Sequence, residues 1–391
     1  RRPPVMTQRP TMATAPEHQE RTETIRIAVE VPGHDYDILI GPGLLGCAGK
    51  LLRASVGKAP LVIISDETVA EHYLDPLHQS LADVNLTARH IILPPGEATK
   101  SFDRLGSVLD SMLAMGIERQ STVIALGGGV VGDLAGLAAA IALRGIGYVQ
   151  IPTTLLAQVD SSIGGKTAVD SPAGKNLIGA FHQPRAVLAD TDTLSTLPLR
   201  DLKSGYGEVV KYGLLGDAAF FAWLERSGKA VLDRDPAALS RAIAESCRAK
   251  ARLVAADERE VGARALLNLG HTFAHALEAE AGFDTTLLHG EAVTLGMLMA
   301  FDLSVRLGHC PPADRERVAR HFSNLGLLHA LPTLPDGRTW NADRLLDRMA
   351  ADKKVVDGAL TFILARGIGA AFVARGVARD DVRAVLSDHG A

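Results

Sequence analysis

The sequence predicts an α/β protein in which an N-terminal Rossmann-like domain with a mostly parallel sheet precedes a C-terminal, all-helical domain. From about residue 22 to residue 198, short β-branched runs alternate with helical stretches, a rhythm typical of βαβ units. Beyond Pro198 long helical patterns replace the strand signals. A chain of 391 residues can bury two ordinary cores. We therefore expect domains at 22–198 and 199–391.

The composition is that of a folded globular chain. Apolar residues make up 47% and charged residues 22%, which excludes disordered, collagenous and coiled-coil classes. The net charge of −4 excludes the basic footprint of a nucleic-acid binder. Three cysteines support neither a disulfide framework nor a cysteine-based zinc site, so we expect a reducing cytoplasm.

Two observations bear on membrane insertion and secretion. No charge-free apolar run reaches the ~20 residues that a membrane span requires, so no membrane partner is expected. Residues 1–21 are rich in Pro, Arg, Thr and Gln and lack an apolar segment, which indicates a flexible leader and not a secretory signal.

The individual elements follow from local pattern. Strands are expected at residues 25–31, 61–65, 90–93, 122–126, 148–151 and 186–189, with a crossover helix at 101–115. In the second half, helices are expected at 236–256, 264–281, 291–307 and 314–324, and a late strand is possible at 360–365. Ligands of parallel sheets bind beyond the carboxyl ends of the strands.

A glycine turn follows the strand expected at 122–126. Gly127, Gly128 and Gly129 come first, then Gly132 and Asp133, and a small-residue helix continues from there. Glycines allow a pyrophosphate to approach the N–H groups at a helix N-terminus. The segment formally satisfies G-x-G-x-x-G, but residues 134–159 lack the acidic partner that such a fingerprint places there. A tight, packed strand-to-helix turn remains the alternative.

Two polar positions lie at the ends of neighbouring strands. Asp66 can accept hydrogen bonds from ribose hydroxyls, or it can simply cap a helix. The turn at 94–97 leads into Lys100 and Ser101, which is equally compatible with a loop followed by a capped helix.

Residues 152–176 form a polar stretch that is too irregular for a regular core. Hydroxyls, Asp160, Lys166 and Lys175 predict a phosphate or sugar site, and a solvated loop is the alternative. The GGKT at 164–167 resembles the end of a P-loop, but Asp160 stands where that motif needs glycine, so nucleotide hydrolysis is excluded. Arg144 is a second candidate for phosphate because of its guanidinium fork, or it is a surface arginine.

The helical half carries a candidate metal site. His271 and His275 are spaced i, i+4 on one helix face, and His289 begins another helix. With the carboxylate of Glu208, this set describes a catalytic zinc-type site with an open position. Thr272 follows His271, so the H-E-x-x-H of metalloproteases is absent. A bare H-x-x-x-H can also belong to a surface helix, and that alternative stays open.

Taken together, these segments resemble the 3-dehydroquinate synthase family over nearly all of the chain from about residue 25. The motifs that carry the resemblance are PGExxKS at 95–101, GGGVVGD at 127–133, PTTLLAQVDSSIGGKT at 152–167, GKN at 174–176, GEVVKYG at 207–213, RALLNLGHTFAHALE at 264–278 and LHGEA at 288–292. Asp201 and Ala274 depart from the residues usual in that family, glutamate and glycine.

The resemblance implies an enzyme of the shikimate pathway, a lyase that converts 3-deoxy-arabino-heptulosonate 7-phosphate to 3-dehydroquinate and phosphate. It implies catalytic NAD, a divalent metal that is zinc or cobalt, and a cytoplasmic homodimer. Such enzymes oxidise the C5 hydroxyl, eliminate phosphate, reduce C5 again and close the ring by intramolecular aldol addition. The ion polarises the C5 oxygen.

Matching positions imply the cofactor sites. The implied metal ligands are Glu208, His271 and His289. The implied NAD contacts are Asp66, Glu97, Lys100, Gly128, Gly129, Val130, Val131, Gly132, Asp133, Thr153, Thr154, Lys175, Thr193 and Thr196.

The same matching implies the substrate contacts. These are Arg144, Asp160, Lys166, Asn176, Lys211, Lys250, Arg264, Asn268, His275 and, from the lysine pair at 353–354, Lys354. Arg144 would reach the phosphate in the site of a dimer partner, and Asp160 would meet the sugar hydroxyls. His275 would then be a substrate and proton-relay residue instead of the fourth metal ligand that its spacing suggests.

Three competing functions remain. Other sugar-phosphate cyclases use NAD and a metal on substrates without a carboxylate, whereas Arg264, Asn268 and His275 favour a carboxylate-bearing substrate. A metal-dependent polyol dehydrogenase would consume NAD stoichiometrically. A metal- or nucleotide-binding regulatory module would bind ligands without turnover.

Overall fold

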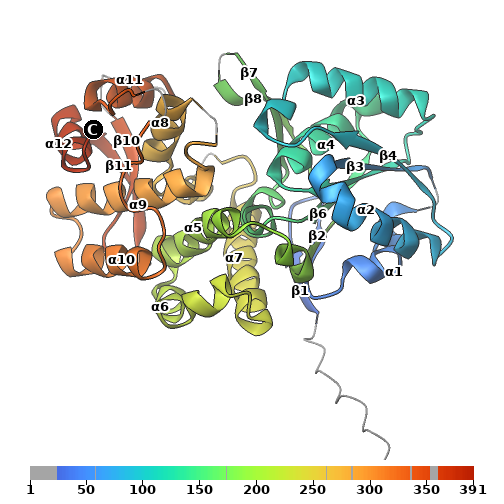
Figure 1. Ribbon diagram of the computed structural model, residues 1–391, viewed down its shortest axis with the longest axis horizontal. Coiled ribbons are helices and arrows are strands. Elements are labelled where there is room, and N and C mark those ends of the chain that lie inside the picture. Colours follow the sequence, from blue (N-terminus) through green and yellow to red (C-terminus); the bar gives the residue numbers. More distant parts are fainter. Residues whose placement is uncertain are drawn as a thin grey trace, which may run out of the picture.

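The computed structural model describes residues 24–57, 59–172, 174–260, 262–282, 285–334, 337–352 and 360–391. The leader expected at 1–21 and the expected substrate residue Lys354 lie outside these ranges. A sheet-containing half and a helical half lie side by side (Figure 1). Among the described helices, none combines the length and the apolar character needed to cross a bilayer.

The N-terminal half is built on a seven-stranded sheet with the order β1-β2-β9-β6-β5-β3-β4. All neighbours pair in parallel except β1 and β2, which confirms the expected mostly parallel sheet. Five of the strands are β1 (Ile25–Val29), β3 (Leu61–Asp66), β4 (Ala88–Leu93), β5 (Thr122–Gly127) and β6 (Gly147–Pro152). The others are β9 (Ala186–Asp190), also expected, and β2 (Tyr36–Gly41), which the sequence analysis missed.

Helices cover both faces of the sheet, which explains why its strands are continuous apolar runs. In β3, Leu61 and Ile63 pack into a core with α1 (Ala48–Val56) and α2 (Glu67–Ala82). Val62 and Ile64 point the other way, into a core with α3 (Phe102–Ala114) and α4 (Gly129–Ile141). Side chains that alternate between two buried faces fix the register of each strand.

A two-stranded antiparallel hairpin, β7 (Lys166–Ser171) and β8 (Gly174–Phe181), stands between the two halves (Figure 1). Residues 152–176 were expected to be too irregular for a regular core, with a solvated loop as the alternative, and the regular elements within them were not predicted. The segment holds a π-helical turn at Ala157–Ser161 and all of β7. Apart from an isolated bridge between Asp170 and Ser101, the hairpin strands pair with each other. Ala168 and Val169 of β7 are buried, whereas β8 leaves Leu177 and Phe181 exposed, so no buried apolar pattern marks β8.

In the residues that the structure describes, the C-terminal half is helical except for one hairpin. The helices are α5 (Leu199–Gly216), α6 (Ala218–Leu232), α7 (Pro236–Ala256), α8 (His271–Ala281), α9 (His289–Arg306), α10 (Pro312–Asn324), α11 (Ala342–Asp352) and α12 (Arg379–Asp388). The possible late strand is β10 (Leu360–Ala365), and it pairs antiparallel with β11 (Ala371–Val377). The short 3₁₀ helices of the chain are Leu45–Cys47, Glu97–Thr99, Ala142–Arg144, Thr191–Ser195 and Ala263–Asn268.

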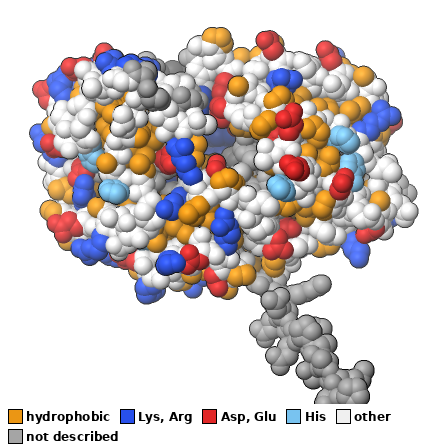
Figure 2. Space-filling model, in the orientation of Figure 1, with side chains coloured by type: hydrophobic (Ala, Val, Ile, Leu, Met, Phe, Trp, Pro, Cys, Tyr) orange, Lys and Arg blue, Asp and Glu red, His pale blue; other side chains and the backbone are white. Residues whose placement is uncertain are grey.

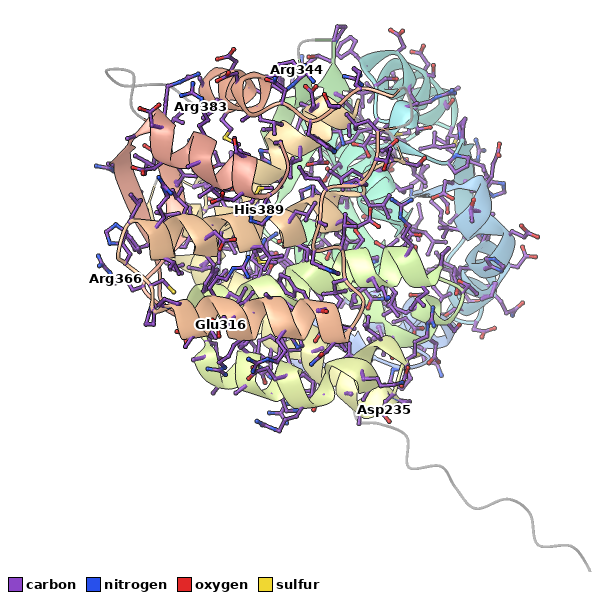
Figure 3. The ribbon with its side chains drawn as sticks, turned by 60° about the vertical axis from the view of Figure 1, so that its left-hand side comes forward. Asp235, Glu316, Arg344, Arg366, Arg383 and His389 are labelled. Carbon is purple, nitrogen blue, oxygen red and sulfur yellow. The ribbon has the colours of Figure 1, made fainter. Side chains whose placement is uncertain are left out.

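Local signals set the helix ends. Asp235 precedes Pro236 and its carboxylate accepts a hydrogen bond from the N–H of Ala238 at 2.8 Å, so it caps α7 (Figure 3). The single helix expected at 264–281 is a wrong prediction, because the chain breaks at Gly270, whose φ is +81°. A Cβ on Gly270 would lie 2.7 Å from the backbone nitrogen of Met297 in α9. The close approach of α9 therefore forces the break and starts α8 at His271.

The largest core joins the two halves. Ile38 and Val187 of the sheet belong to the same buried cluster as Tyr212 of α5 and Ile243 of α7. Helices α5 and α7 therefore share a buried core with the sheet. This shared core fixes the position of their side chains relative to the sheet.

Candidate active site

A groove of about 390 Å³ opens at the carboxyl ends of β3, β5 and β6. This is where open α/β sheets bind their ligands. Eight of the residues expected to contact a dinucleotide line it, namely Asp66, Gly128, Gly129, Val130, Val131, Thr153, Thr154 and Thr196. Asp201, one of the two departures from the family pattern, lines it as well.

The groove has the features of a phosphate cradle. Helix α4 begins there at Gly129 and has no acidic residue in its first turn, so its N-terminal N–H groups favour an anion. The hydroxyl of Thr153 is buried and has no hydrogen-bond partner among the described residues. A Cβ on Gly132 would lie 2.6 Å from Oε1 of Gln150. The glycine turn thus packs tightly, and it also leaves an orphaned hydroxyl beside a helix N-terminus, which fits a pyrophosphate.

The other expected cofactor residues lie around or beneath this groove. Asp66 lines it and at the same time caps α2, accepting from the N–H of Val69 at 3.0 Å. Lys100 is buried, and its Nζ contacts Oδ2 of Asp133 at 2.6 Å and Oδ1 of Asn176 at 2.5 Å. Burial disfavours the protonated form of Lys100, but the attraction of the Asp133 carboxylate is stronger than this effect and raises the pKa of the lysine. Thr193 is 1% exposed, so it supports the groove from below.

Lys175 on β8 connects this region with the helical half. Its Nζ lies 3.6 Å from Oε1 of Glu97, which follows the groove residue Gly96. The same Nζ lies 3.4 Å from Oε1 of Glu278 on α8. The hairpin therefore carries an ionic contact between the two halves.

The structure brings Glu208, His271 and His289 together, with one ligand atom of each within 4.8 Å of the others. Oε1 of Glu208 is 3.6 Å from Nε2 of His271 and 3.4 Å from Nε2 of His289. Among the described residues, neither oxygen of Glu208 has a hydrogen bond of regular geometry, although Lys211 Nζ forms an ion pair with Oε2 at 2.5 Å. Two imidazole nitrogens converging on a fully buried carboxylate fit a divalent cation such as zinc.

The electrostatics of Glu208 and His271 suit ligation, whereas at His289 burial opposes the charge of the ring but Glu278 outweighs it and raises its pKa to about 10, so a cation bound there has to displace a proton. Burial opposes ionisation of Glu208, but Lys211 outweighs it and lowers the pKa of this carboxyl to about 2. Burial, together with Lys211, lowers the pKa of His271 to about 3, which keeps its ring neutral. His275 stands outside this donor set, with its ring centroid 5.5 Å from that of His271.

A second polar cluster surrounds Asp160, which lies in the π-helical turn. Its Oδ1 contacts Nζ of Lys250 at 2.5 Å and Nζ of Lys211 at 4.0 Å, and it accepts from the hydroxyl of Tyr212 at 2.9 Å. Burial opposes its charge, but the two lysines hold the pKa of Asp160 well below its usual range. Burial lowers the pKa of Lys250 to about 8. π-Turns are frequent at functional sites, where they aim a side chain.

Two of the remaining expected substrate residues, Lys166 and Asn268, contact Glu260, an acidic residue that the sequence analysis missed. Lys166 Nζ forms an ion pair with Oε2 of Glu260, and the amide of Asn268 donates to Oε1 of Glu260 at 2.6 Å. Arg264 is fully buried and donates to the carbonyl of Gly164 at 3.1 Å, while its Nε has no partner among the described residues. Arg144 is exposed and does not line the groove.

Glu278 is the second residue that the sequence analysis missed as a site residue. It ends the motif at 264–278 and follows His271 by seven positions, which places both on one face of α8. That spacing was the one sequence signal that Glu278 lies near the metal donors. It is a weak signal, because a glutamate on a helix more commonly faces solvent.

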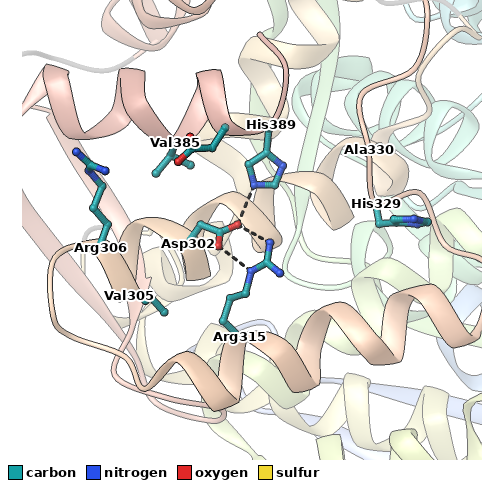
Figure 4. A pocket seen from close by; sticks show the side chains of 9 residues that line it. Asp302, Val305, Arg306, Arg315, His329, Ala330, Val385 and His389 are labelled. Atoms are coloured by element: carbon teal, nitrogen blue, oxygen red, sulfur yellow. Dashed lines mark hydrogen bonds and ion pairs between the residues drawn. The ribbon is translucent and has the colours of Figure 1, made fainter.

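Another cavity, of about 520 Å³, lies among α9, α10 and α12 (Figure 4). It contains none of the expected site residues. Asp302 accepts from Nε and Nη2 of Arg315 at 2.7 and 2.8 Å and contacts Nε2 of His389 at 2.8 Å, so its central charges neutralise one another. Figure 2 shows the surface hollowed between the two halves.

The fold and the site define a two-domain class in which a sheet domain offers a dinucleotide groove and a helical domain offers metal donors. Solved sugar-phosphate cyclases share this fold. A 2-epi-5-epi-valiolone synthase from Streptomyces hygroscopicus, solved with NAD⁺ and Zn²⁺ bound, is 31% identical, with a TM-score of 0.82 over 90% of this chain and 96% of that one. A 2-deoxy-scyllo-inosose synthase, solved with carbaglucose-6-phosphate, NAD⁺ and Co²⁺, has a TM-score of 0.81 at 24% identity, covering 94% and 100% of the two chains.

The chain belongs to the 3-dehydroquinate synthase family. The N-terminal part of that family matches residues 90–204 and the C-terminal part matches residues 205–355. The 3-dehydroquinate synthase of Rhodospirillum rubrum is 57% identical over 92% of this chain and 94% of its own length. That of Caulobacter vibrioides is 55% identical over 91% and 96%.

Proposed function

We propose that this protein is a lyase that converts 3-deoxy-arabino-heptulosonate 7-phosphate to 3-dehydroquinate and phosphate. One observation carries the proposal: in a member of this family, the donors of Glu208, His271 and His289 converge beside the buried cluster of Lys211, Asp160 and Lys250. This arrangement supports the proposal, because the proposed metal donors lie next to groups that can bind several hydroxyls and an anion.

The cofactors follow from the same residues. Glu208, His271 and His289 would hold zinc or cobalt, and the groove from Asp66 to Thr196 would hold NAD. When bound, NAD supplies a reversible two-electron acceptor and the metal supplies a Lewis acid for the hydroxyl that is oxidised. NAD is regenerated within each turnover, so only catalytic amounts are needed.

The chain's own side chains bind and orient the substrate. Asp160 fixes the positions of Lys211 and Lys250 through its Oδ1, and these three groups would meet the sugar hydroxyls. The other proposed contacts to carboxylate and phosphate are Lys166, Asn176, Arg264, Asn268, His275 and Lys354. The buried, unpartnered Nε of Arg264 supports such a role, because a buried guanidinium nitrogen needs an acceptor.

The assembly and location belong to the same proposal. The chain would divide into domains at 22–198 and 199–391, and it would act as a cytoplasmic homodimer. In that dimer Arg144 would reach the substrate phosphate in the partner's site. Its exposure outside the groove supports this role.

Two other enzyme classes can be distinguished from the proposed one by their substrates and by whether they form NADH. A sister cyclase would use a sugar phosphate without a carboxylate, against which Arg264, Asn268 and His275 argue. A polyol dehydrogenase would form NADH in step with product.

The deciding experiment incubates the purified protein with the heptulosonate phosphate, catalytic NAD and zinc or cobalt. Phosphate and dehydroquinate in equal amounts, without net NADH, would establish the proposed reaction. Failure with metal-loaded protein would contradict it, and sedoheptulose 7-phosphate and glucose 6-phosphate would then test the sister activities.

A further inference from the structure

A buried carboxylate stands directly behind one of the proposed metal ligands. Glu278 on α8 is 4% exposed, and its Oε2 lies 3.1 Å from Nδ1 of His289. Its other oxygen lies 3.4 Å from Nζ of Lys175 on the hairpin. Burying an ionised carboxylate is unfavourable unless it is paired, and Glu278 has a partner at each oxygen.

The two proposed histidine ligands have equivalent arrangements. Nδ1 of His271 faces the carbonyl of Leu269 at 3.2 Å, and Nε2 faces Oε1 of Glu208 at 3.6 Å. His289 has Glu278 at Nδ1 and the same Glu208 oxygen 3.4 Å from Nε2. In a neutral imidazole the nitrogen that donates a proton leaves the other as the ligand. Both rings are therefore oriented from behind, one by a backbone carbonyl and the other by a carboxylate.

We propose that Glu278 is a positioning residue that accepts the Nδ1 proton of His289 in a hydrogen bond and so directs the Nε2 lone pair of that ring toward the metal. The inference rests on the metal site of the proposed function. Carboxylates in this position orient ligating histidines and raise their basicity, and their loss commonly weakens metal binding ~10- to 100-fold.

The same helix supplies a matched control. Glu280 is 1% exposed and is also ion-paired, with Nε of Arg344 at 2.9 Å and Nε of Arg348 at 2.8 Å. Both arginines come from α11, and Figure 3 labels Arg344. Residues two positions apart on a helix do not share a face, so Glu280 points away from the face that carries Glu278. Removing the charge of Glu280 thus perturbs the packing of α8 without touching a proposed metal ligand.

The test compares zinc affinity in the unaltered protein, Glu278→Gln, Glu278→Ala and Glu280→Gln, measured by competition with a chromogenic chelator. We expect Glu278→Ala to bind zinc ~10- to 100-fold more weakly, Glu278→Gln at least about threefold more weakly, and Glu280→Gln within about twofold of the unaltered protein. The visible spectrum of bound Co²⁺ should shift for both Glu278 variants and remain unchanged for Glu280→Gln.

Glu278→Leu, measured in the same way, has a similar volume and no hydrogen-bond acceptor, so it decides the outcome if Glu278→Ala does not fold. Zinc affinity and a Co²⁺ spectrum equal to those of the unaltered protein would overturn the positioning role while leaving the metal site in place. Failure of the unaltered protein to bind one equivalent of metal would instead overturn the proposed function and this inference with it.

Discussion

The carboxylate of Glu260 binds Lys166 through one oxygen and Asn268, at 2.6 Å, through the other. Glu260 lies in the loop after α7 with a φ of +59°, and the two groups that it contacts come from different halves of the molecule. Both are proposed substrate contacts. An anionic substrate that uses them has to displace this carboxylate first.

Glu260→Gln should therefore bind the heptulosonate phosphate more tightly. A half-exposed ion pair contributes ~0.2–1 kcal/mol, so we expect a Kd that is lower by about 1.4- to fivefold. Calorimetric titration of NAD-free protein measures it, with Glu258→Gln as a neighbouring control. Weaker binding by Glu260→Gln would mean that this carboxylate helps to hold the substrate.

His271→Ala should lose metal and activity together, because it removes one of three donors that converge on the same point. His275→Ala should keep one equivalent of metal and lose turnover, since its ring stands outside the donor set. Elemental analysis of the dialysed proteins, beside steady-state rates, measures both. Stoichiometric metal in His271→Ala would remove this residue from the ligand set.

Arg144→Ala and Lys211→Ala should each be nearly inactive alone and should complement each other when mixed. If sites are shared in a dimer, random exchange makes half of the dimers mixed, and each of these carries one complete site, giving about a quarter of the unaltered activity. Rates before and after subunit exchange measure this. No recovery after proven exchange would mean that each site is self-contained.

The stability of the protein should fall in acid partly because of His321 in α10. It is 4% exposed, its Nε2 lies 3.1 Å from the hydroxyl of Tyr206, and burial lowers its pKa from 6.5 to about 4. Between these values the unfolded chain binds a proton that the folded chain does not, so the free energy of unfolding decreases as pH falls through this window.

His321→Gln should lessen that decrease, since glutamine does not titrate and can still bond to Tyr206. The loss of stability between pH 7 and 4.5 should be smaller by ~2–3 kcal/mol in the variant. Urea unfolding at the two pH values measures it, and equal losses in both proteins would rule out this histidine as the cause.

Gly270→Ala should destabilise the fold by ~3 kcal/mol or more, because it combines a left-handed backbone with a collision against the backbone of α9. It should also weaken metal binding, since His271 is the next residue. Gly106→Ala in α3 meets nothing within 4 Å, and it should stabilise by ~0.5–1 kcal/mol. Denaturant midpoints compare the two, and a Gly270→Ala protein as stable as the parent would show that α9 can move away.

The sequence predicted those parts of the fold in which the pattern of apolar residues indicates which side chains are buried. Residues 61–65 and 122–126 are short, β-branched runs that are apolar on both faces, a pattern that favours interior strands. The β7–β8 hairpin was missed because β8 leaves apolar side chains such as Leu177 exposed and β7 buries a short apolar run at Ala168 and Val169. The break at Gly270 was missed because it depends on the approach of α9 from elsewhere in the chain.

The residues of the candidate site also fall into two groups, those that the sequence could predict and those that it could not. Residues with a motif, such as the turn at 127–133, could be placed in advance. Glu260 and Glu278 could not, because a lone glutamate near a helix normally faces water, and only the tertiary structure sets these two against Lys166 and His289.

Lys175 lies between two carboxylates that belong to different halves of the molecule, Glu97 beside the groove and Glu278 behind His289. Such a contact can couple the two binding sites, and the coupling free energy is reciprocal. If the dinucleotide changes the affinity for metal by some factor, metal changes the affinity for the dinucleotide by the same factor. An affinity measured for either ligand alone therefore describes a different thermodynamic state from the one that turns over.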